Sequence, residues 1–276
     1  MGVIKLGICQ MPVTASKEQN LSRARQMAAE AARAGARVVV LPEMFNCPYQ
    51  HEFFTRFAET CPDGDTFRML TSAARELGVY LIGGSIPEAE DGRTYNTCFV
   101  YGPDGRMLGR QRKLHLFNIE TDDLVFRESD TLSPGTGPPT VFVTPLVTFG
   151  VAICFDLRFP ELFRDLAARG AELIIAPAAF NTFTGPPHWE LLLRARAVDN
   201  QVFVAGAGPA WTEDSPYPYY GHSLVVNPWA EVIAGAGERE TVLLAEIDLG
   251  QVAEVRKKLP LRRSEESALI NFSENV

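Results

Sequence analysis

The sequence predicts an α/β fold. Short segments that are apolar at every residue alternate with segments whose apolar residues recur at helical spacing, along nearly all of the 276 residues. A segment such as 38–41, Val-Val-Val-Leu, is typical of a strand that is covered on both faces of its sheet. No low-complexity linker divides the sequence, so we expect one domain over residues 1–276, with 260–276 as a charged tail at a surface or interface.

The first helix is the most clearly marked element. Ser16 and Gln19 form a capping-box pattern, apolar residues follow at helical spacing, and Gly35 is typical of the residue that ends a helix. A Gly-Pro-Asp-Gly turn at 102–105 lies between two strand-like segments and predicts a β-hairpin. Pro160 stands where proline is tolerated, in the first turn of a helix.

The remaining elements follow the same two periodicities. The expected strands are residues 3–9, 38–41, 79–82, 96–101, 107–112, 148–154, 173–176, 202–205, 223–226 and 242–247. The other expected helices are residues 64–77, 160–169, 187–198 and one after 247. Residues 113–139 are rich in Asp, Thr, Pro and Gly, which is typical of a long functional loop or a disordered one.

Composition excludes several classes of protein. No run of eighteen apolar residues predicts a membrane span, and no basic segment precedes an apolar one as in a secretory signal. The net charge of -8 argues against a nucleic-acid partner, whose phosphates attract basic surfaces. The five cysteines are widely spaced and form no CxxC pair, which argues against a disulfide framework or a zinc site. We therefore expect a reducing, cytoplasmic location.

Cys154 is the first candidate for chemistry. It ends the apolar segment 148–154, and α/β proteins bind ligands at the carboxyl ends of their strands. In a tight turn after Cys154, the backbone N–H of Phe155 would be free to stabilise an oxyanion. The alternative is a small buried hydrophobic residue, which is the commonest role of a free cysteine.

Glu43 and Lys113 are the candidate partners of that thiol. Glu43 follows the strand at 38–41 and would reach the same crevice if the two strands were neighbours; a buried carboxylate can act as the base. Lys113 precedes the apolar residues 114–117, which could draw its ammonium inward to stabilise a thiolate or an oxyanion. The alternatives are a solvated carboxylate and a solvated charge cluster, and we expect the latter for Arg110 and Arg112.

A cysteine–histidine pair is the second possibility. His188 is expected to pack or cap at a helix start, and His115 and His222 to form hydrogen bonds in the core. None of these three, nor His51, combines a strand-end position with an adjacent catalytic pattern. The sequence also lacks a P-loop, an HExxH motif and a GxSxG motif.

Three ordered segments resemble the nitrilase superfamily of carbon–nitrogen hydrolases: 41–43 (Leu-Pro-Glu), 112–117 (Arg-Lys-Leu-His-Leu-Phe) and 153–162 (Ile-Cys-Phe-Asp-Leu-Arg-Phe-Pro-Glu-Leu). Within the superfamily the sequence resembles the omega-amidases most. That resemblance rests on the segments 45–49, 81–88, 95–98, 131–135, 180–190 and 227–229. The resemblance implies a four-layer α-β-β-α sandwich that dimerises through helices.

The resemblance also implies roles for individual residues. It makes Glu43, Lys113 and Cys154 a catalytic triad, with the backbone of Phe155 as an oxyanion donor. Glu128 matches a second active-site glutamate of the family, which positions groups and handles protons.

Residues for substrate binding follow from the same resemblance. Arg158, four residues after the nucleophile, would hold a substrate carboxylate; a structural salt bridge is the alternative. Tyr49, Phe117 and Phe180 would form the walls of the pocket.

The implied activity is hydrolysis of the terminal carboxamide of a small dicarboxylic acid monoamide, such as alpha-ketoglutaramate or alpha-ketosuccinamate, through a thioester. No metal or organic cofactor is required. The expected partners are the small carboxamide and a second copy of the chain, in a homodimer or higher homo-oligomer. The alternatives are a deaminated-glutathione amidase, an N-carbamoyl amino acid hydrolase, a catalytically silent interaction protein and a redox sensor.

Overall fold

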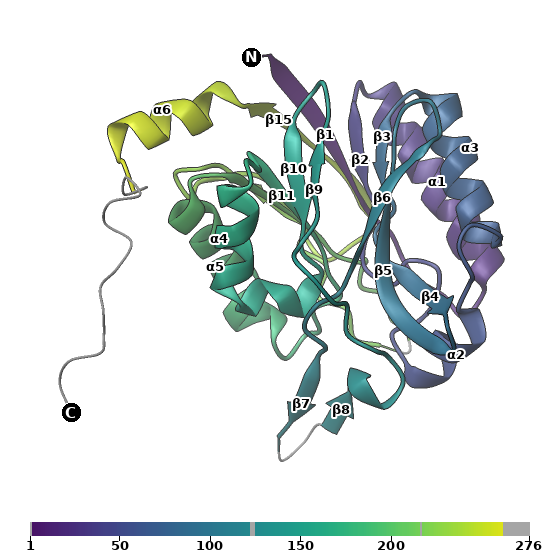
Figure 1. The fold of residues 1–276 in the computed structure, drawn as a ribbon. Helices are drawn as coiled ribbons and strands as arrows, with labels where there is room; N and C mark the ends of the chain where they lie inside the picture. Colours follow the sequence, from purple (N-terminus) through teal and green to yellow (C-terminus); the bar gives the residue numbers. More distant parts are fainter. Residues whose placement is uncertain (1, 122–124, 216, 262–276) are drawn as a thin grey trace, which may run out of the picture.

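The computed structural model describes residues 2–121, 125–215 and 217–261. Two large sheets lie face to face in it (Figure 1). In the described residues the first sheet runs in the order β15 (Thr241–Asp248), β1 (Val3–Gln10), β2 (Val38–Val40), β3 (Tyr80–Ile82), β5 (Arg93–Tyr101) and β4 (Ile86–Glu90), with β6 (Met107–Arg112) also paired to β5.

The second sheet runs in the order β14 (Val232–Gly235), β13 (Leu224–Val226), β12 (Phe203–Ala207), β11 (Leu173–Pro177), β10 (Thr148–Val151) and β9 (Val141–Val143). A separate ribbon pairs β7 (Asn118–Glu120) with β8 (Val125–Arg127). The helices are α1 (Lys17–Arg33), α2 (His51–Phe57), α3 (Asp65–Leu77), α4 (Pro160–Ala168), α5 (Gly185–Asn200) and α6 (Gly250–Lys258), with 3₁₀ turns η1 (Glu128–Asp130) and η2 (Cys154–Arg158).

Helices cover the outer face of each sheet. Figure 1 shows α1 and α3 against the first sheet and α4 and α5 against the second. Successive side chains along a strand point to opposite faces of the sheet, so one strand contributes residues to two hydrophobic cores. Val38 and Val40 of β2 pack in one core with Phe149 and Val151 of the second sheet, whereas Val39 packs in another core with α1 and α3. The α/β class and the four-layer sandwich are therefore confirmed.

Local signals in the sequence predicted several elements correctly. Ser16 caps α1 by accepting a hydrogen bond from the Gln19 N–H, and Gly35 follows the helix with a φ of 90°. The predicted hairpin is the antiparallel pair β5–β6. Helix α5 begins at Gly185, two residues before the predicted start.

Five strands of the described residues were not predicted: β7 and β8 of the separate ribbon, and β4, β9 and β14, each of which lies at the end of a sheet. Strand β4 carries charged and proline residues of the kind that protect an open edge, whereas β9 (Val-Phe-Val) and β14 (Val-Ile-Ala-Gly) are apolar but very short. In β4 the sequence is Ile-Pro-Glu-Ala-Glu. Helix α2 was also not predicted. Residues 113–139 are not one long loop, because they contain β7, β8 and η1.

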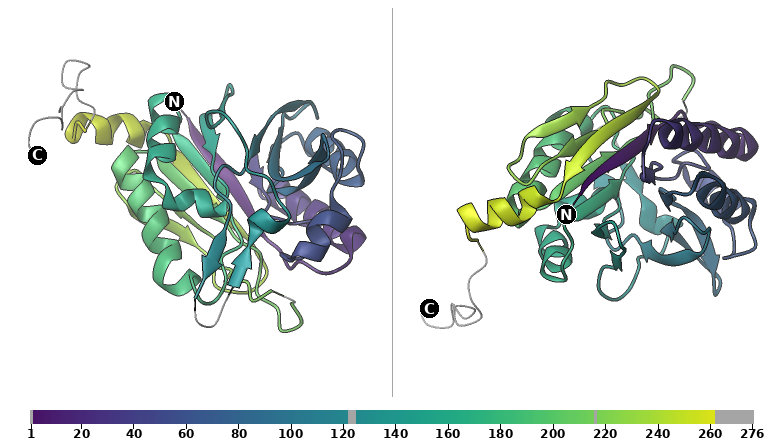
Figure 2. Two further views of the ribbon diagram at one scale, coloured as in Figure 1. Left: turned by 60° about the horizontal axis from the view of Figure 1, so that its bottom comes forward. Right: turned by 90° about the horizontal axis from the view of Figure 1, so that it is seen from above.

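Helix α6 extends away from the two sheets and leads to Leu261, as Figure 2 shows from two further directions. The predicted charged tail lies almost wholly outside the described residues. Among the described helices, none has both the length and the apolar character needed to cross a membrane.

Candidate active site

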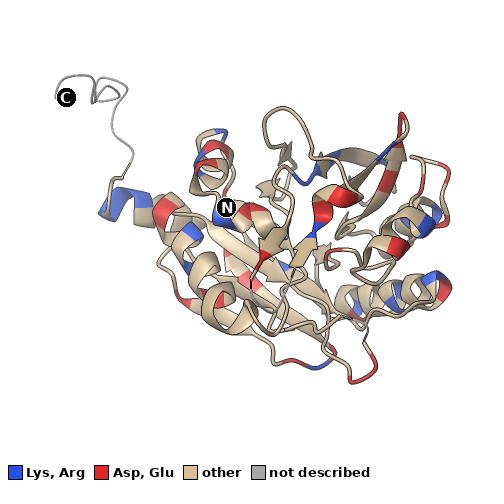
Figure 3. Ribbon diagram, turned by 90° about the horizontal axis from the view of Figure 1, so that it is seen from below, with Lys and Arg blue, Asp and Glu red and all other residues tan. Residues whose placement is uncertain are grey.

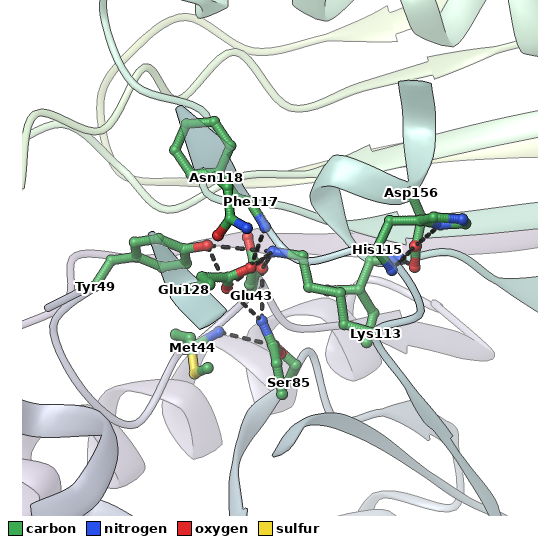
Figure 4. A network of polar contacts seen from close by, with 12 residues as sticks. Glu43, Met44, Tyr49, Ser85, Lys113, His115, Phe117, Asn118, Glu128 and Asp156 are labelled. Carbon is green, nitrogen blue, oxygen red and sulfur yellow. Dashed lines mark hydrogen bonds and ion pairs between the residues drawn. The ribbon is translucent and has the colours of Figure 1, made fainter. Parts of the chain in front are cut away.

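Three buried charged side chains meet next to Cys154. Figure 3 shows Lys, Arg, Asp and Glu mainly on the outer helices and loops, and few charged side chains of the described residues are buried. Lys113 follows β6, and its Nζ donates a hydrogen bond to Glu43 Oε1 over 2.9 Å and to Glu128 Oε1 over 3.0 Å. All three side chains have no exposed area. Two carboxylates therefore share one ammonium (Figure 4).

Glu128 is held from several sides. The Tyr49 hydroxyl donates a hydrogen bond to its Oε1 over 2.6 Å, and the Phe117 N–H donates to its Oε2 over 2.6 Å. Burial, and then the charges of Glu128 and Glu43, raise the pKa of Tyr49 well above its usual value, which keeps this hydroxyl a donor. With Lys113 also bonded to it, Glu128 has little freedom to move.

Glu43 uses only one of its two oxygens in this network. Its Oε1 accepts hydrogen bonds from Lys113 and from Asn96 Nδ2, the latter over 2.8 Å. Its Oε2 is buried and has no aligned hydrogen-bond partner among the described residues. Burial raises the pKa of Glu43, and the nearby Lys113 ammonium opposes this. Glu43 thus has one oxygen available to accept a proton.

Cys154 is the first residue of η2 and is nearly buried. Burial and the charge of Glu43 raise the pKa of its thiol well above the usual value, while Lys113 and the backbone of Ala179 act in the opposite direction. The carboxylate of Glu43 and the thiol of Cys154 also contact each other through a side-chain hydrogen bond, so a proton can pass between them. A raised pKa favours the protonated thiol, and a protonated thiol needs a base when it reacts.

The backbone beside both groups is unusual. Cys154 has a φ of 48° and Met44, next to Glu43, has a φ of 49°. A left-handed conformation is unfavourable for residues with a Cβ atom, and such residues cluster at functional sites. The Met44 N–H donates a hydrogen bond to Ser85 Oγ over 3.1 Å, which helps to hold that conformation.

One detail of the predicted geometry was wrong, and one condition attached to it is not met. The strand expected at 148–154 ends at Val151, so Cys154 lies in a turn beyond the strand and not at its last residue. The strands that precede Glu43 and Cys154 are not neighbours in one sheet, because β2 belongs to the first sheet and β10 to the second. The two groups meet where the sheets face each other, which is a different crevice from the expected one.

A small pocket opens beside the thiol. The residues that line it include Phe117, Cys154, Phe155, Arg158, Phe180 and Tyr217. Phe117 and Phe180 line this pocket, and their contact with a substrate stays a prediction. Tyr49 is not among the lining residues; it is almost fully buried, and its hydroxyl donates a hydrogen bond to Glu128.

Arg158 brings a positive charge to this pocket. Burial lowers its pKa, and its Nη2 lies 3.3 Å from Nδ1 of His188. Its guanidinium is 5.6 Å from the ring centres of Phe155 and Phe180. No ion pair joins Arg158 to a carboxylate of the described residues, so the alternative of a structural salt bridge is not found.

Each histidine has a partner other than the thiol. His51 bonds with Thr131, His115 with Asp156, and His222 with a backbone carbonyl. None of these contacts involves Cys154, so the geometry gives no support to a cysteine–histidine pair. Within the described ranges, no group of three or more His, Cys, Asp or Glu side chains could hold a metal ion.

Arg110 and Arg112 are not a solvated charge cluster, which corrects the prediction. Both form ion pairs with Glu88, which is fully buried, and with the half-exposed Glu90. The Arg112 guanidinium also lies 3.7 Å from the centre of the Tyr95 ring. These ion pairs brace the strand that leads to the active-site lysine.

Three participants in the site were missed. Asn96, Asp156 and Tyr217 gave no catalytic signal of their own, although Asn96 and Asp156 lie within segments that carried the family resemblance. Asn96 lies next to Lys113 because β5 pairs with β6, and this pairing is seen only in the tertiary structure.

Comparison with known proteins agrees with this geometry. A sequence model described as carbon-nitrogen hydrolase matches residues 5–257. The chain is 50% identical to omega-amidase NIT2-A of Xenopus laevis, over 99% of each chain. It is 47% identical to human omega-amidase NIT2, over 98% of this chain and 97% of the human one.

Solved structures give the same result. Nit3 of Saccharomyces cerevisiae, a member of branch 10 of the nitrilase superfamily, has a TM-score of 0.88 at 39% identity, over 95% of this chain and 96% of Nit3. An amidase from Nesterenkonia sp. has a TM-score of 0.78 at 26% identity, over 93% and 95%. With this family match, these identities and a site built of buried carboxylates, a lysine and a thiol, the chain belongs to the carbon-nitrogen hydrolase family.

Proposed function

We propose that this protein is an omega-amidase-like enzyme. It hydrolyses the terminal carboxamide of a small dicarboxylic acid monoamide, of the alpha-ketoglutaramate or alpha-ketosuccinamate type, to the acid and ammonia. The observation that carries the proposal is the Lys113 ammonium shared by Glu43 and Glu128, beside a pocket that contains Cys154. The omega-amidases among its relatives support the substrate class.

The first step forms the carbon–sulfur bond. Glu43 takes the proton of Cys154 on its free Oε2 as the sulfur attacks the amide carbon. Burial makes this carboxylate a stronger base than one in water, because its raised pKa favours the protonated form. The neutral thiol and the basic carboxylate suit a proton transfer that occurs during the attack.

The attack places negative charge on the amide oxygen. The Lys113 Nζ and the backbone N–H of Phe155 are the groups that stabilise this oxyanion. Lys113 keeps its charge, because the carboxylates of Glu128 and Glu43 outweigh its burial and raise its pKa. Glu43 returns its proton to the amide nitrogen, the carbon–nitrogen bond breaks and ammonia leaves, so a thioester remains on Cys154.

Water completes the reaction. Glu43, again ionised, takes a proton from a water molecule that attacks the thioester carbon. The carbon–sulfur bond then breaks, the thiol regains its proton, and the acid is released. Glu128 contributes by fixing Lys113, since it is itself fixed by Tyr49 and Phe117. No step needs a metal or an organic cofactor.

Arg158 is the proposed partner of the carboxylate at the far end of the substrate. It lines the same pocket as Cys154 and has no ion pair with a carboxylate among the described residues. A guanidinium binds a carboxylate through two parallel hydrogen bonds, which also orients the substrate. Phe117 and Phe180 would pack against the apolar part of the substrate.

The proposal also covers the number of domains, the location of the protein and the number of subunits. The family match over residues 5–257 supports one domain for the chain. A cytoplasmic homodimer or higher homo-oligomer is proposed from the family resemblance. Light scattering behind a sizing column measures the number of subunits.

Ammonia release tests the function directly. Alpha-ketoglutaramate, alpha-ketosuccinamate, deaminated glutathione and N-carbamoyl amino acids are assayed in parallel, with Cys154→Ala as the inactive control and Cys98→Ala, another buried cysteine, as the matched one. We expect the keto-acid amides to give the highest kcat/KM. Mass spectrometry of a slow substrate should find the acyl group on Cys154. Full activity in Cys154→Ala would contradict the mechanism, and preference for another substrate would contradict the specificity.

A further inference from the structure

Asp156 connects two segments of the site through a single buried carboxylate (Figure 4). Its Oδ2 accepts a hydrogen bond from the N–H of Ile153 over 3.0 Å. Its Oδ1 accepts a hydrogen bond from the N–H of His115 over 2.9 Å and lies 2.8 Å from His115 Nδ1. Ile153 directly precedes Cys154, and His115 is two residues after Lys113. One carboxylate thus contacts the neighbours of both groups.

On the nucleophile side, Asp156 closes the turn around Cys154. The Asp156 N–H donates to the Ile153 carbonyl over 3.0 Å, while its side chain accepts from the Ile153 N–H. The turn is therefore closed in both directions. Cys154 has a φ of 48°, a conformation that persists only where the surroundings hold it. The carboxylate supplies part of that hold.

On the lysine side, Asp156 acts across the two sheets. Lys113 follows β6 of the first sheet, and Cys154 follows β10 of the second. The position of the Cys154 sulfur relative to the Lys113 ammonium therefore depends on how the two sheets are placed relative to each other. The bond from Asp156 to His115 joins the segments directly, and the His115 ring is stacked on Phe159 at 3.5 Å and 9°. Rotation of either segment would break these contacts.

We propose that Asp156 is a positioning residue, which holds Cys154 in its left-handed turn and in register with Lys113, and that His115 is its contact on the opposite segment. Asp156 does not line the pocket, so it acts through other residues. The inference rests on the proposed function where it is tested by kcat, because that measurement needs an amide that the enzyme hydrolyses. Its chemical readout, the reactivity of the Cys154 thiol, does not depend on which amide is hydrolysed.

The variants are chosen to remove single bonds. Asp156→Asn keeps the size of the side chain but leaves one acceptor oxygen, so either the Ile153 N–H or the His115 N–H faces an NH₂ group. His115→Phe keeps a ring to stack on Phe159 and removes only the bond at Nδ1. Asp165→Asn is the matched control, because this aspartate on α4 forms only a half-exposed ion pair with Arg169.

Steady-state kinetics and alkylation by iodoacetamide are measured on all three variants. We expect Asp156→Asn to lower kcat about 100-fold, with KM within about threefold, since small displacements at a reaction centre have effects of this size. His115→Phe should lower kcat about tenfold by the same reasoning. Alkylation of Cys154 should slow in the same order, because Glu43 is less well placed to take the proton. Asp165→Asn should match the wild type in both measurements.

Thermal unfolding separates positioning from folding. A folded Asp156→Asn with wild-type kcat and alkylation rate overturns the proposal, as does a loss of kcat that only follows the folded fraction. If Asp156→Asn does not fold, His115→Phe decides: wild-type kcat and alkylation overturn the proposal. If the wild type hydrolyses no amide, the proposed function fails, whereas slower alkylation in Asp156→Asn and not in Asp165→Asn still supports the positioning role.

Discussion

The Nζ atom of Lys113 lies 2.9 Å from Oε1 of Glu43, and neither side chain has any area exposed to solvent. Burial disfavours both charges, but the second carboxylate, Glu128, adds to the attraction on the lysine side. The lysine therefore stays charged, while the pKa of Glu43 rises. A fixed cation next to a basic carboxylate is the arrangement that a thiol-dependent hydrolase requires.

The pH dependence should report the state of Glu43. This group must be ionised to accept the thiol proton, and burial raises its pKa above the ordinary 4.5. The kcat/KM should therefore fall as the pH decreases through a value above 4.5. Initial rates across the acid range measure this limb. A limb at or below 4.5 would show that Glu43 is not the base.

Glu43→Gln should separate activity from stability. Because burial raises the pKa of Glu43 in the folded chain, ionisation of Glu43 destabilises the fold. The contribution of Glu43 to stability is fully present below pH 4.5 and is lost as the pH rises through the folded pKa. Glutamine cannot ionise, and Lys113 keeps Glu128 as its partner. At neutral pH we expect kcat to fall at least about 100-fold, while Tm rises by roughly 2–4 °C.

Calorimetry at several pH values checks this prediction. The gain in Tm should shrink as the pH falls through the folded pKa toward 4.5, because Glu43 then becomes protonated in the folded chain. Glu190→Gln, at an exposed ion pair with Arg194, is the control and should change neither kcat nor Tm. A clear decrease in the Tm of Glu43→Gln at neutral pH would contradict the predicted direction of the change in stability.

Arg158→Met should weaken binding of the substrate carboxylate. A hydrogen bond to a charged group contributes about 1.5–3 kcal/mol, so KM for an alpha-keto dicarboxylic monoamide should rise roughly 10- to 100-fold. A neutral amide of similar length, which has no carboxylate to lose, should show little change. Arg164→Met, at an exposed arginine on α4, is the control. Equal losses for charged and neutral amides would assign Arg158 a structural role instead.

Glu88→Ala should destabilise the protein. The side chain of Glu88 is fully buried between Arg110 and Arg112 and also accepts a hydrogen bond from Thr97 over 2.7 Å. Arg110 and Arg112 are partly exposed and keep Glu90 as a partner, so the loss is that of hydrogen bonds to a charged group, about 1.5–3 kcal/mol. Chemical unfolding measures this change. Glu90→Ala, which contacts the same arginines from a half-exposed position, should have a much smaller effect; equal effects would contradict the argument.

Much of the local structure could be predicted because its causes are local. Ser16 caps the helix that follows it, and the turn at 102–105 closes a hairpin between strands adjacent in the chain. The alternation of apolar segments was enough for the α/β class. Glu43, Lys113 and Cys154 were identified by short motifs, which record residue types and order but contain no distances.

The assembly of the site depends on tertiary structure. Lys113 and Glu43 are separated by 70 residues and meet only because β6 and β2 belong to one sheet, while Cys154 approaches from the other sheet. The roles of Tyr49 and Asp156 could not be predicted, since a hydroxyl or a carboxylate becomes a support only when its acceptors and donors are brought to it. Motifs determine which groups are present, whereas the packing of two sheets determines their distances, their burial and therefore their pKa values.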